Sequence, residues 1–132
     1  MTVRAYIAGP IFGKPNGNQE AFQLMERDLA TIGITPVNPW KLDKSHDGPC
    51  PIGPTGSEDV GTVHTILCHM LTDLKHLLTC DVVIFLSGWE YSSGSFVEFT
   101  TARATGKLMF FSWDQLLSWY SASNLAPWTD VS

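Results

Sequence analysis

The residues best suited to chemistry lie in the segment 87–98, where four serines precede a glutamate. The serines are Ser87, Ser92, Ser93 and Ser95, and the carboxylate belongs to Glu98. A helix amino terminus offers free N–H groups and a partial positive charge, so Ser92, Gly94 and Ser95 would form a cradle for a phosphate. The alternative is that these serines only cap the helix, which is the commoner role of such residues.

Glu98 follows these hydroxyls at a distance that suits a nucleotide. The separation is a rise of roughly 5 to 9 Å along a helix at ~1.5 Å per residue, close to the span from a 5'-phosphate to the anomeric carbon. We expect the helix dipole to keep a carboxylate in the first turns ionised, which suits a nucleophile better than a general acid. The neighbours of Glu98 are apolar or small, namely Phe96, Val97, Phe99 and Ala102. Glu98 is therefore expected to face a ligand.

Asp73 is the candidate second carboxylate, which cleavage of a glycosidic bond commonly needs. It lies in an expected helix over residues 60–79, on the same face as His69 and His76. These histidines would tune Asp73 or protonate a leaving base, although surface histidines without such a role are common. The same region holds a set of potential zinc ligands, namely His64, Cys68, His69 and His76. They do not all share one helix face, so we assign no metal, and we expect no cofactor.

The remaining elements would bring these residues to one edge of a sheet. Apolar strands are predicted at residues 3–8, 34–38, 82–86 and 107–111. Helices are predicted at residues 18–33, with Asn18 as the cap, at 60–79 and 96–106, and from 112 onward. This order predicts an α/β fold, a small doubly wound, flavodoxin-like parallel sheet with helices on both faces. The loops 9–17 and 87–95 and the stretch after residue 38 would then converge at the carboxyl edge of the sheet.

One stretch, 39–59, carries too many proline and glycine residues for regular structure and is long for a connection. We predict that it is a lid or an interface loop, the alternative being a mobile excursion without a role. The end of the chain, 124–132, is expected to fray. The whole chain of 132 residues is expected to form a single domain.

Composition excludes several classes of function. A net charge of −5 argues against wide contact with a nucleic-acid polymer, and no lysine follows the serine turn as in a nucleotide triphosphatase. No apolar run approaches the ~20 residues of a membrane span, so a soluble protein is expected. The amino terminus lacks a signal-peptide layout, and Cys50, Cys68 and Cys80 are odd in number and widely spaced. These features predict reduced thiols and a cytoplasmic location, in the host cytoplasm if the protein is phage-encoded.

Three motifs together resemble a known family. They are YIAGPIF near the amino terminus, TIGITPVNPW at the end of the first helix, and CDVVIFLSGWEYSSGSFVEFTTARATGK from Cys80 onward. In this order they resemble the nucleoside 2-deoxyribosyltransferase-like superfamily, most closely its short phage and bacterial branch, over residues 3–111. Members of that superfamily either transfer deoxyribose between bases or hydrolyse 2'-deoxynucleoside 5'-monophosphates.

The resemblance implies roles for individual residues. Glu98 would be the nucleophile that attacks the anomeric carbon, Asp73 the auxiliary acid, and Tyr6 the aromatic residue of the first strand motif. Ser92 stands where relatives that accept free nucleosides carry an aspartate, so the resemblance implies a monophosphate substrate. The approach SSGSFVE departs from the family pattern, which leaves the identity of the substrate open.

The sequence therefore predicts an N-glycoside hydrolase that acts on a (2'-deoxy)nucleoside 5'-monophosphate. The expected substrate-binding residues are Gly9, Pro10, Phe12, Trp89, Ser92, Gly94 and Ser95, with Phe12, Trp40 or Trp89 stacking on the base. The alternatives are a deoxyribosyltransferase and a non-catalytic nucleotide-binding module. The expected partners are a small nucleotide and further copies of the chain, in a homodimer or a larger homo-oligomer, and neither a nucleic-acid polymer nor a membrane.

Overall fold

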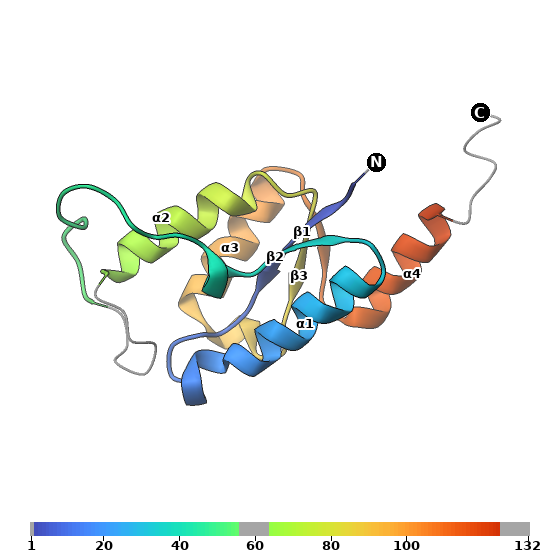
Figure 1. The fold of residues 1–132 in the computed structure, drawn as a ribbon, viewed down its shortest axis with the longest axis horizontal. Helices are drawn as coiled ribbons and strands as arrows, with labels where there is room; N and C mark the ends of the chain where they lie inside the picture. The colour runs from blue at the N-terminus through green and yellow to red at the C-terminus, as the bar shows by residue number, and fades with distance from the viewer. Residues whose placement is uncertain (1, 56–63, 125–132) are drawn as a thin grey trace.

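Four short parallel strands form the centre of the structure, a computed structural model that describes residues 2–55 and 64–124 (Figure 1). The strands are β1 (Arg4–Ala8), β2 (Thr35–Val37), β3 (Val82–Phe85) and β4 (Leu108–Phe110). They pair in the order β2-β1-β3-β4, with Tyr6 of β1 opposite Val37 and Val83. This order confirms the predicted doubly wound, flavodoxin-like α/β fold.

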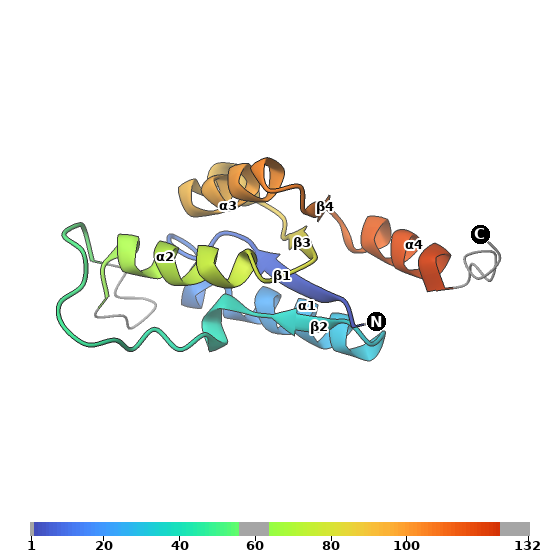
Figure 2. The same cartoon turned by 90° about the horizontal axis from the view of Figure 1, so that it is seen from above.

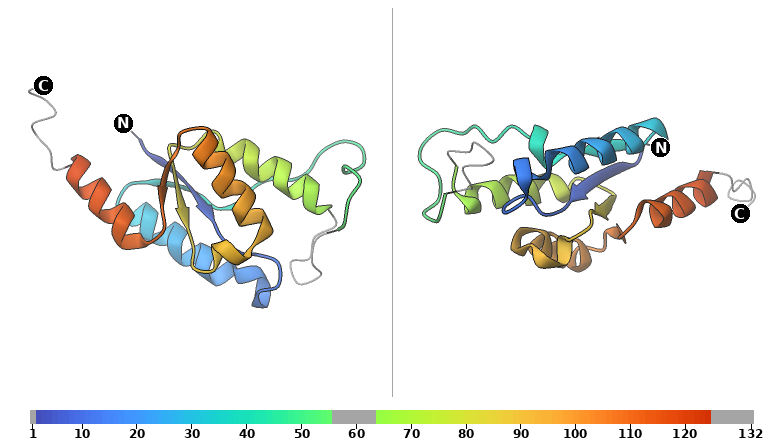
Figure 3. Two further views of the ribbon diagram at one scale, coloured as in Figure 1. Left: turned by 180° about the vertical axis from the view of Figure 1, so that it is seen from behind. Right: turned by 90° about the horizontal axis from the view of Figure 1, so that it is seen from below.

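Four helices cover both faces of this sheet. They are α1 (Gln19–Thr31), α2 (Ile66–Leu77), α3 (Ser93–Ala104) and α4 (Trp113–Asn124). Among the residues that the structure describes, the loops hold three short 3-10 turns, η1 (Pro15–Asn18), η2 (Pro39–Lys41) and η4 (Trp89–Tyr91). Figure 2 shows α1 and α3 on opposite sides of the strands, and Figure 3 shows α2 and α3 on the same side. None of the helices in the described part of the chain is long and apolar enough to cross a bilayer.

The alternation of side chains along β1 divides the core in two, because successive residues of a strand point to opposite faces. Ala5 and Ile7 belong to one buried cluster, whose helical members are Phe22 and Leu29 of α1 and Leu116 of α4. Tyr6 and Ala8 belong to a second cluster, which includes Leu77 of α2 and Ala102 of α3. The tyrosine hydroxyl is therefore directed to the face that α2 and α3 cover.

The start of α3 and the cap of α1 differ from the prediction. Helix α3 begins at Ser93 rather than at residue 96, because the Ser92 hydroxyl accepts a bond from the Ser95 N–H and caps the helix. Asn18 takes the N-cap position of α1 with a φ of 62° but makes no side-chain cap. Its Nδ2 instead donates to the Pro10 carbonyl oxygen at 3.0 Å, which holds the loop after β1 against the start of α1.

The predicted loop and tail are described in part. Residues 39–41 form η2 and residues 42–55 are irregular, apart from a bridge between Thr55 and Thr65. The rest of the predicted lid and residues 60–63 of the predicted helix 60–79 lie outside the described residues. So does the tail beyond Asn124, which is the last residue of α4. Residues 64 and 65 are described and are not helical, because Thr65 is extended and caps α2, which begins at Ile66.

Gly9 provides a test of the packing at the carboxyl edge of the sheet. A Cβ at this position would lie 2.9 Å from both the Cβ and the Cδ1 of Leu86, so the loops after β1 and β3 approach too closely for a side chain. We expect Gly9→Ala to lower the free energy of unfolding by roughly 1 to 3 kcal/mol. Urea denaturation would show this as a lower midpoint with an unchanged slope.

Gly53→Ala is the matched control, since no atom lies within 4 Å of the Cβ that it would add. Equal midpoints for the two variants would contradict the tight packing of Gly9 on Leu86.

Candidate functional site

A cavity of about 400 Å³ opens at the carboxyl edge of the sheet. Three loops and the facing sides of α2 and α3 line it. The lining residues are Gly9, Ile11 and Phe12 after β1, Pro39 after β2, Ile66, His69, Met70, Asp73 and Leu74 of α2, and Tyr91, Ser92, Ser93, Gly94, Ser95, Val97 and Glu98 around the start of α3. The volume lies within the range of small-molecule binding sites.

Most of the predicted site residues meet in this cavity. Those that line it are Gly9, Phe12, Asp73, Ser92, Gly94, Ser95 and Glu98. Tyr6 lies behind it and reaches Glu98 from the sheet, while Pro10 and Trp89 are absent from the lining. The cavity therefore unites both predicted carboxylates with the predicted phosphate cradle.

Glu98 is held by Tyr6 at the bottom of the site. The Tyr6 hydroxyl donates a hydrogen bond to Oε2 of Glu98, and the exposed fractions of the two residues are 0% and 9%. Burial, followed by the charge of Glu98, raises the pKa of Tyr6 well above its ordinary value. Tyr6 therefore keeps its proton and remains a donor to the carboxyl.

Burial also raises the pKa of Glu98 to about 8, although the Tyr6 bond and Lys44 act in the opposite direction. The prediction that the helix dipole keeps this carboxylate ionised is therefore wrong. Since α3 starts at Ser93, Glu98 is its sixth residue, and the partial charge of a helix end falls off within the first turn. Loss of solvation outweighs what remains of that charge.

The second carboxyl, Asp73, is paired with a cation that the sequence did not reveal. Lys44 Nζ lies 2.7 Å from Oδ1 of Asp73, and their side chains are only 15% and 14% exposed. Burial raises the pKa of Asp73, while Lys44 and the more distant His76 lower it. The two carboxyls thus have different surroundings, since Asp73 has a cationic partner and Glu98 a neutral one.

The start of α3 combines a cap with an unused donor. The Ser92 hydroxyl accepts the N–H of Ser95 at 3.3 Å, which is the capping role given above as the alternative. The Ser95 hydroxyl is only 1% exposed, and it has no hydrogen-bond partner among the described residues. A buried hydroxyl without a partner is costly, so its place in the cavity lining indicates a site for a polar ligand.

The two histidines near Asp73 are not equivalent. His69 lines the cavity with its ring edge-on to Phe12, and burial lowers its pKa to about 4. A neutral His69 has no proton ready for a leaving base, which argues against that predicted role. His76 does not line the cavity, and its Nδ1 lies 2.9 Å from the Thr72 carbonyl oxygen.

Of the three aromatic side chains predicted to stack on a base, only Phe12 lines the cavity. Trp89 stacks on Phe99 at 5.0 Å between ring centroids, and Nε1 of Trp40 donates to the Gly17 carbonyl oxygen. Tyr91, which the sequence analysis missed, lines the cavity while 91% exposed. The η4 turn separates Trp89, which packs inward, from Tyr91, which is left at the rim.

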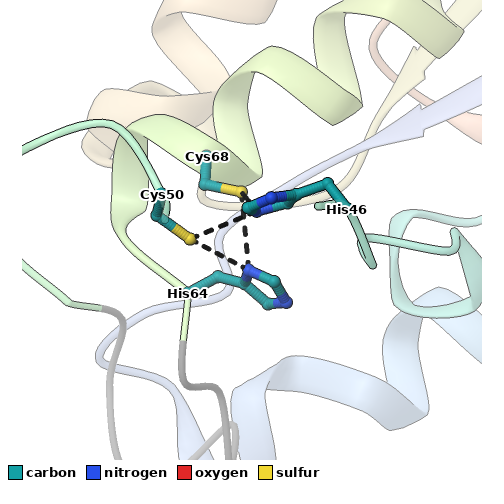
Figure 4. Close-up of side chains that lie close together, drawn as sticks. All are labelled: His46, Cys50, His64 and Cys68. Atoms are coloured by element: carbon teal, nitrogen blue, oxygen red, sulfur yellow. Dashed lines mark hydrogen bonds between the residues drawn. The ribbon is translucent and has the colours of Figure 1, made fainter. Parts of the chain in front are cut away.

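A second group of reactive side chains gathers beside the amino end of α2 (Figure 4). It consists of His46, Cys50, His64 and Cys68, whose ligand atoms all lie within 4.8 Å of one another. The zinc ligands considered from the sequence all lie in the predicted helix 60–79, and that set leaves out His46 and Cys50 of the loop after β2. Both pairs nevertheless share a signal in the sequence, the spacing His-x3-Cys, which occurs at 46–50 and again at 64–68.

Together these features define a small α/β protein with a ligand cavity at the carboxyl edge of a parallel sheet. Residues 3–111 match a family described as a domain of unknown function, DUF4406, and the chain belongs to this family. The match takes in the four strands, α1 to α3 and both carboxyls of the cavity. No curated protein matches the chain.

The raised pKa of Glu98 predicts how stability depends on pH. The folded protein holds this proton up to about pH 8, whereas the unfolded chain releases it near the ordinary value of 4.5. Between these two pH values the folded state binds more protons than the unfolded state, so the free energy of unfolding falls as the pH rises from 4.5 to 8. Replacing Glu98 by a residue that does not titrate should abolish this fall in the free energy of unfolding, which amounts to roughly 2 to 5 kcal/mol.

Glu98→Gln tests this prediction, because the amide oxygen can still accept the Tyr6 bond. Urea denaturation at pH 5 and pH 8 should show a smaller loss of stability in the variant than in the unmodified protein. Glu20→Gln, at an exposed position of α1, is the control and should keep the original dependence. The same dependence in all three proteins would mean that Glu98 titrates normally.

Proposed function

We propose that the protein is an N-glycoside hydrolase that splits a (2'-deoxy)nucleoside 5'-monophosphate into its base and the sugar 5-phosphate. One observation carries the proposal. The Ser95 hydroxyl, which is buried and has no partner in the described part of the chain, and the Tyr6-bonded Glu98 carboxyl line one cavity, about one helical turn apart. An anion donor and a carboxyl at this separation suit the two ends of a sugar phosphate. The resemblance of the motifs to deoxyribosyltransferase-like enzymes supports the same reading.

The start of α3 would bind the phosphate. The N–H groups of a first helical turn point outward and favour an anion, and Ser95 can donate its unused proton. Apart from its chain neighbours and the backbone of its own helix, no atom of the described residues lies within 4 Å of the Cβ position of Gly94, so a ligand can approach the backbone there. Glu98 lies three positions after Ser95 on the helix, a rise of about 4.5 Å. The sugar would extend from the phosphate toward this carboxyl.

The two carboxyls would divide the chemistry. In its ionised form Glu98 attacks C1', a bond forms between its oxygen and C1', and the bond from C1' to the base nitrogen breaks. Asp73, whose raised pKa helps it to hold a proton, protonates the leaving base. Water then attacks C1', Asp73 takes a proton from this water, and Glu98 leaves as a carboxylate.

Tyr6 would assist by keeping Glu98 in position. Its proton stays on the hydroxyl, so it can stabilise the carboxylate both before attack and after its release. Positive charge that develops on the sugar would also favour the ionised form of Glu98, offsetting part of the effect of burial.

A pKa of about 8 for Glu98 also favours a second candidate, a nucleotide-binding module without turnover. At neutral pH most of the empty protein would carry a protonated, weakly nucleophilic carboxyl. Calorimetry that shows tight binding of a monophosphate, with no free base in the same sample after prolonged incubation, would favour this candidate over the hydrolase.

The catalytic role is tested by removing the carboxyl of Glu98. We expect Glu98→Ala to reduce base release from 2'-deoxynucleoside 5'-monophosphates by at least about 10³-fold, because no other group forms the bond to C1'. Chromatography of the products measures the released base. Adding a competing free base to the same assay would reveal transfer instead of hydrolysis.

Thr100→Ala is the matched control, since Thr100 lies on α3 with an exposed side chain outside the cavity lining. Base release at the same rate from Glu98→Ala and from Thr100→Ala would exclude the nucleophile proposed above.

The phosphate cradle is tested separately with Ser95→Ala. Losing one hydrogen bond to a charged group costs about 1.5 to 3 kcal/mol, so KM for the monophosphate should rise by roughly 10- to 100-fold. The rate with the corresponding free nucleoside should change little, because that substrate has no phosphate. Steady-state kinetics with both substrates provides the comparison, and an equal effect on the two would place the phosphate elsewhere.

A further inference from the structure

His46, Cys50, His64 and Cys68 form a group that the proposed hydrolase does not use. None of the four lines the cavity. They come from two parts of the chain, the irregular loop that follows η2 and the residues at the amino end of α2 (Figure 4). We propose that these four side chains bind one zinc ion, which fastens the loop to α2.

The distances within the group are close to those of a tetrahedral zinc site. Sγ of Cys50 lies 3.3 Å from Nε2 of His46 and 3.1 Å from Nδ1 of His64. Sγ of Cys68 lies 3.3 Å and 3.5 Å from the same two nitrogens. With Zn–S of about 2.3 Å and Zn–N of about 2.05 Å, a tetrahedron places sulfur and nitrogen about 3.6 Å apart. The four observed distances are therefore within a few tenths of an ångström of this value, and all four ligand atoms lie within 4.8 Å of one another.

The composition of the group also favours a metal. The sulfur of each cysteine lies close to a ring nitrogen of both histidines. Without a metal, the four sulfur–nitrogen contacts could be hydrogen bonds only if donors were shared between them. A single cation at the centre accepts one lone pair from each of the four atoms. Two thiolates with two imidazoles are a common ligand set for structural zinc, and four protein ligands leave no open position for a substrate.

The surrounding backbone holds the two halves of the group together. The N–H of Ile66 donates to the Pro54 carbonyl oxygen at 2.8 Å, beside the bridge between Thr55 and Thr65. The Thr65 hydroxyl in turn accepts the N–H of Cys68 and caps α2. Cys68 is thereby fixed in the first turn of the helix, where its sulfur faces the loop.

The group lies close to the cavity, so a bound ion would stabilise the loop that lines up with the cavity wall. His46 lies two residues after Lys44, which reaches Asp73 at the cavity wall. An ion bound by His46 and Cys50 would hold this part of the loop over α2 and keep Lys44 within reach of Asp73. The inference does not rest on the proposed hydrolase activity, since metal content and stability report on it directly.

The first test measures zinc in protein that is made without a polyhistidine tag and purified without chelators. Mass spectrometry of the metal should find about one zinc per chain. Cys50→Ser and His46→Ala should each lose at least half of it, and both positions are solvent-accessible enough for the variants to fold. Cys80→Ser and His76→Ala, which lie outside the group, are the matched controls and should keep it.

The second test replaces zinc with cobalt(II) after removal of the metal by a chelator. We expect thiolate-to-cobalt charge-transfer absorption and the strong visible bands of a tetrahedral ion, both weakened in Cys50→Ser and retained in Cys80→Ser. Removal of the metal should lower Tm by on the order of 10 °C, and added zinc should restore it.

Three results would overturn the proposal. One is protein with less than about a tenth of a zinc per chain that also fails to take up zinc or cobalt after reduction. Another is a disulfide bond between Cys50 and Cys68 that persists in reducing buffer, because the two sulfurs could then not bind zinc as thiolates. An equal metal content in Cys50→Ser and in Cys80→Ser would likewise place any bound ion outside this group.

Discussion

The hydrogen bond from Tyr6 to the buried carboxyl of Glu98 determines most of the architecture of the cavity. Burying a carboxyl without a partner is costly, and the donor must come from a part of the molecule that does not move. Tyr6 meets this requirement because it lies on β1, which pairs with a strand on each side. The inner face of α3 can therefore carry an acidic residue at a position where an apolar side chain would otherwise pack.

Much of this arrangement could be predicted from the sequence, because it depends on local patterns. The apolar run of β3, the alternation along β1 and the glycines after the helices indicate the elements, and the loops of a parallel sheet meet at one edge. That reasoning brought Glu98, Asp73 and Ser95 together correctly. It misplaced the start of α3, because Ser92 to Ser95 resemble a loop until the cap of Ser92 on Ser95 is seen. The predicted ionisation of Glu98 was wrong for the same reason, because the earlier start of α3 places Glu98 beyond the first turn of the helix.

What could not be predicted lies in contacts that the loop after β2 makes. Lys44 meets Asp73 across 29 residues, and His46 meets Cys68 across 22. Such a loop has no periodic pattern, so nothing in the sequence specifies its path over α2. The prolines and glycines of this stretch predicted a lid or an interface loop, but they did not indicate which of its side chains would contact α2. The contact of Lys44 with Asp73 is visible only in the structure, whereas His46 and Cys50 share with His64 and Cys68 a spacing that the sequence does show.

The segment matched by the family ends at residue 111, and α4 begins at Trp113. Yet Leu116 of α4 is fully buried in the cluster that contains Ile34 and Ile84, with Trp119 packed against it. The matched segment of this chain thus leaves one side of its own sheet partly uncovered. The aromatic helix that follows the last strand, α4, covers that side.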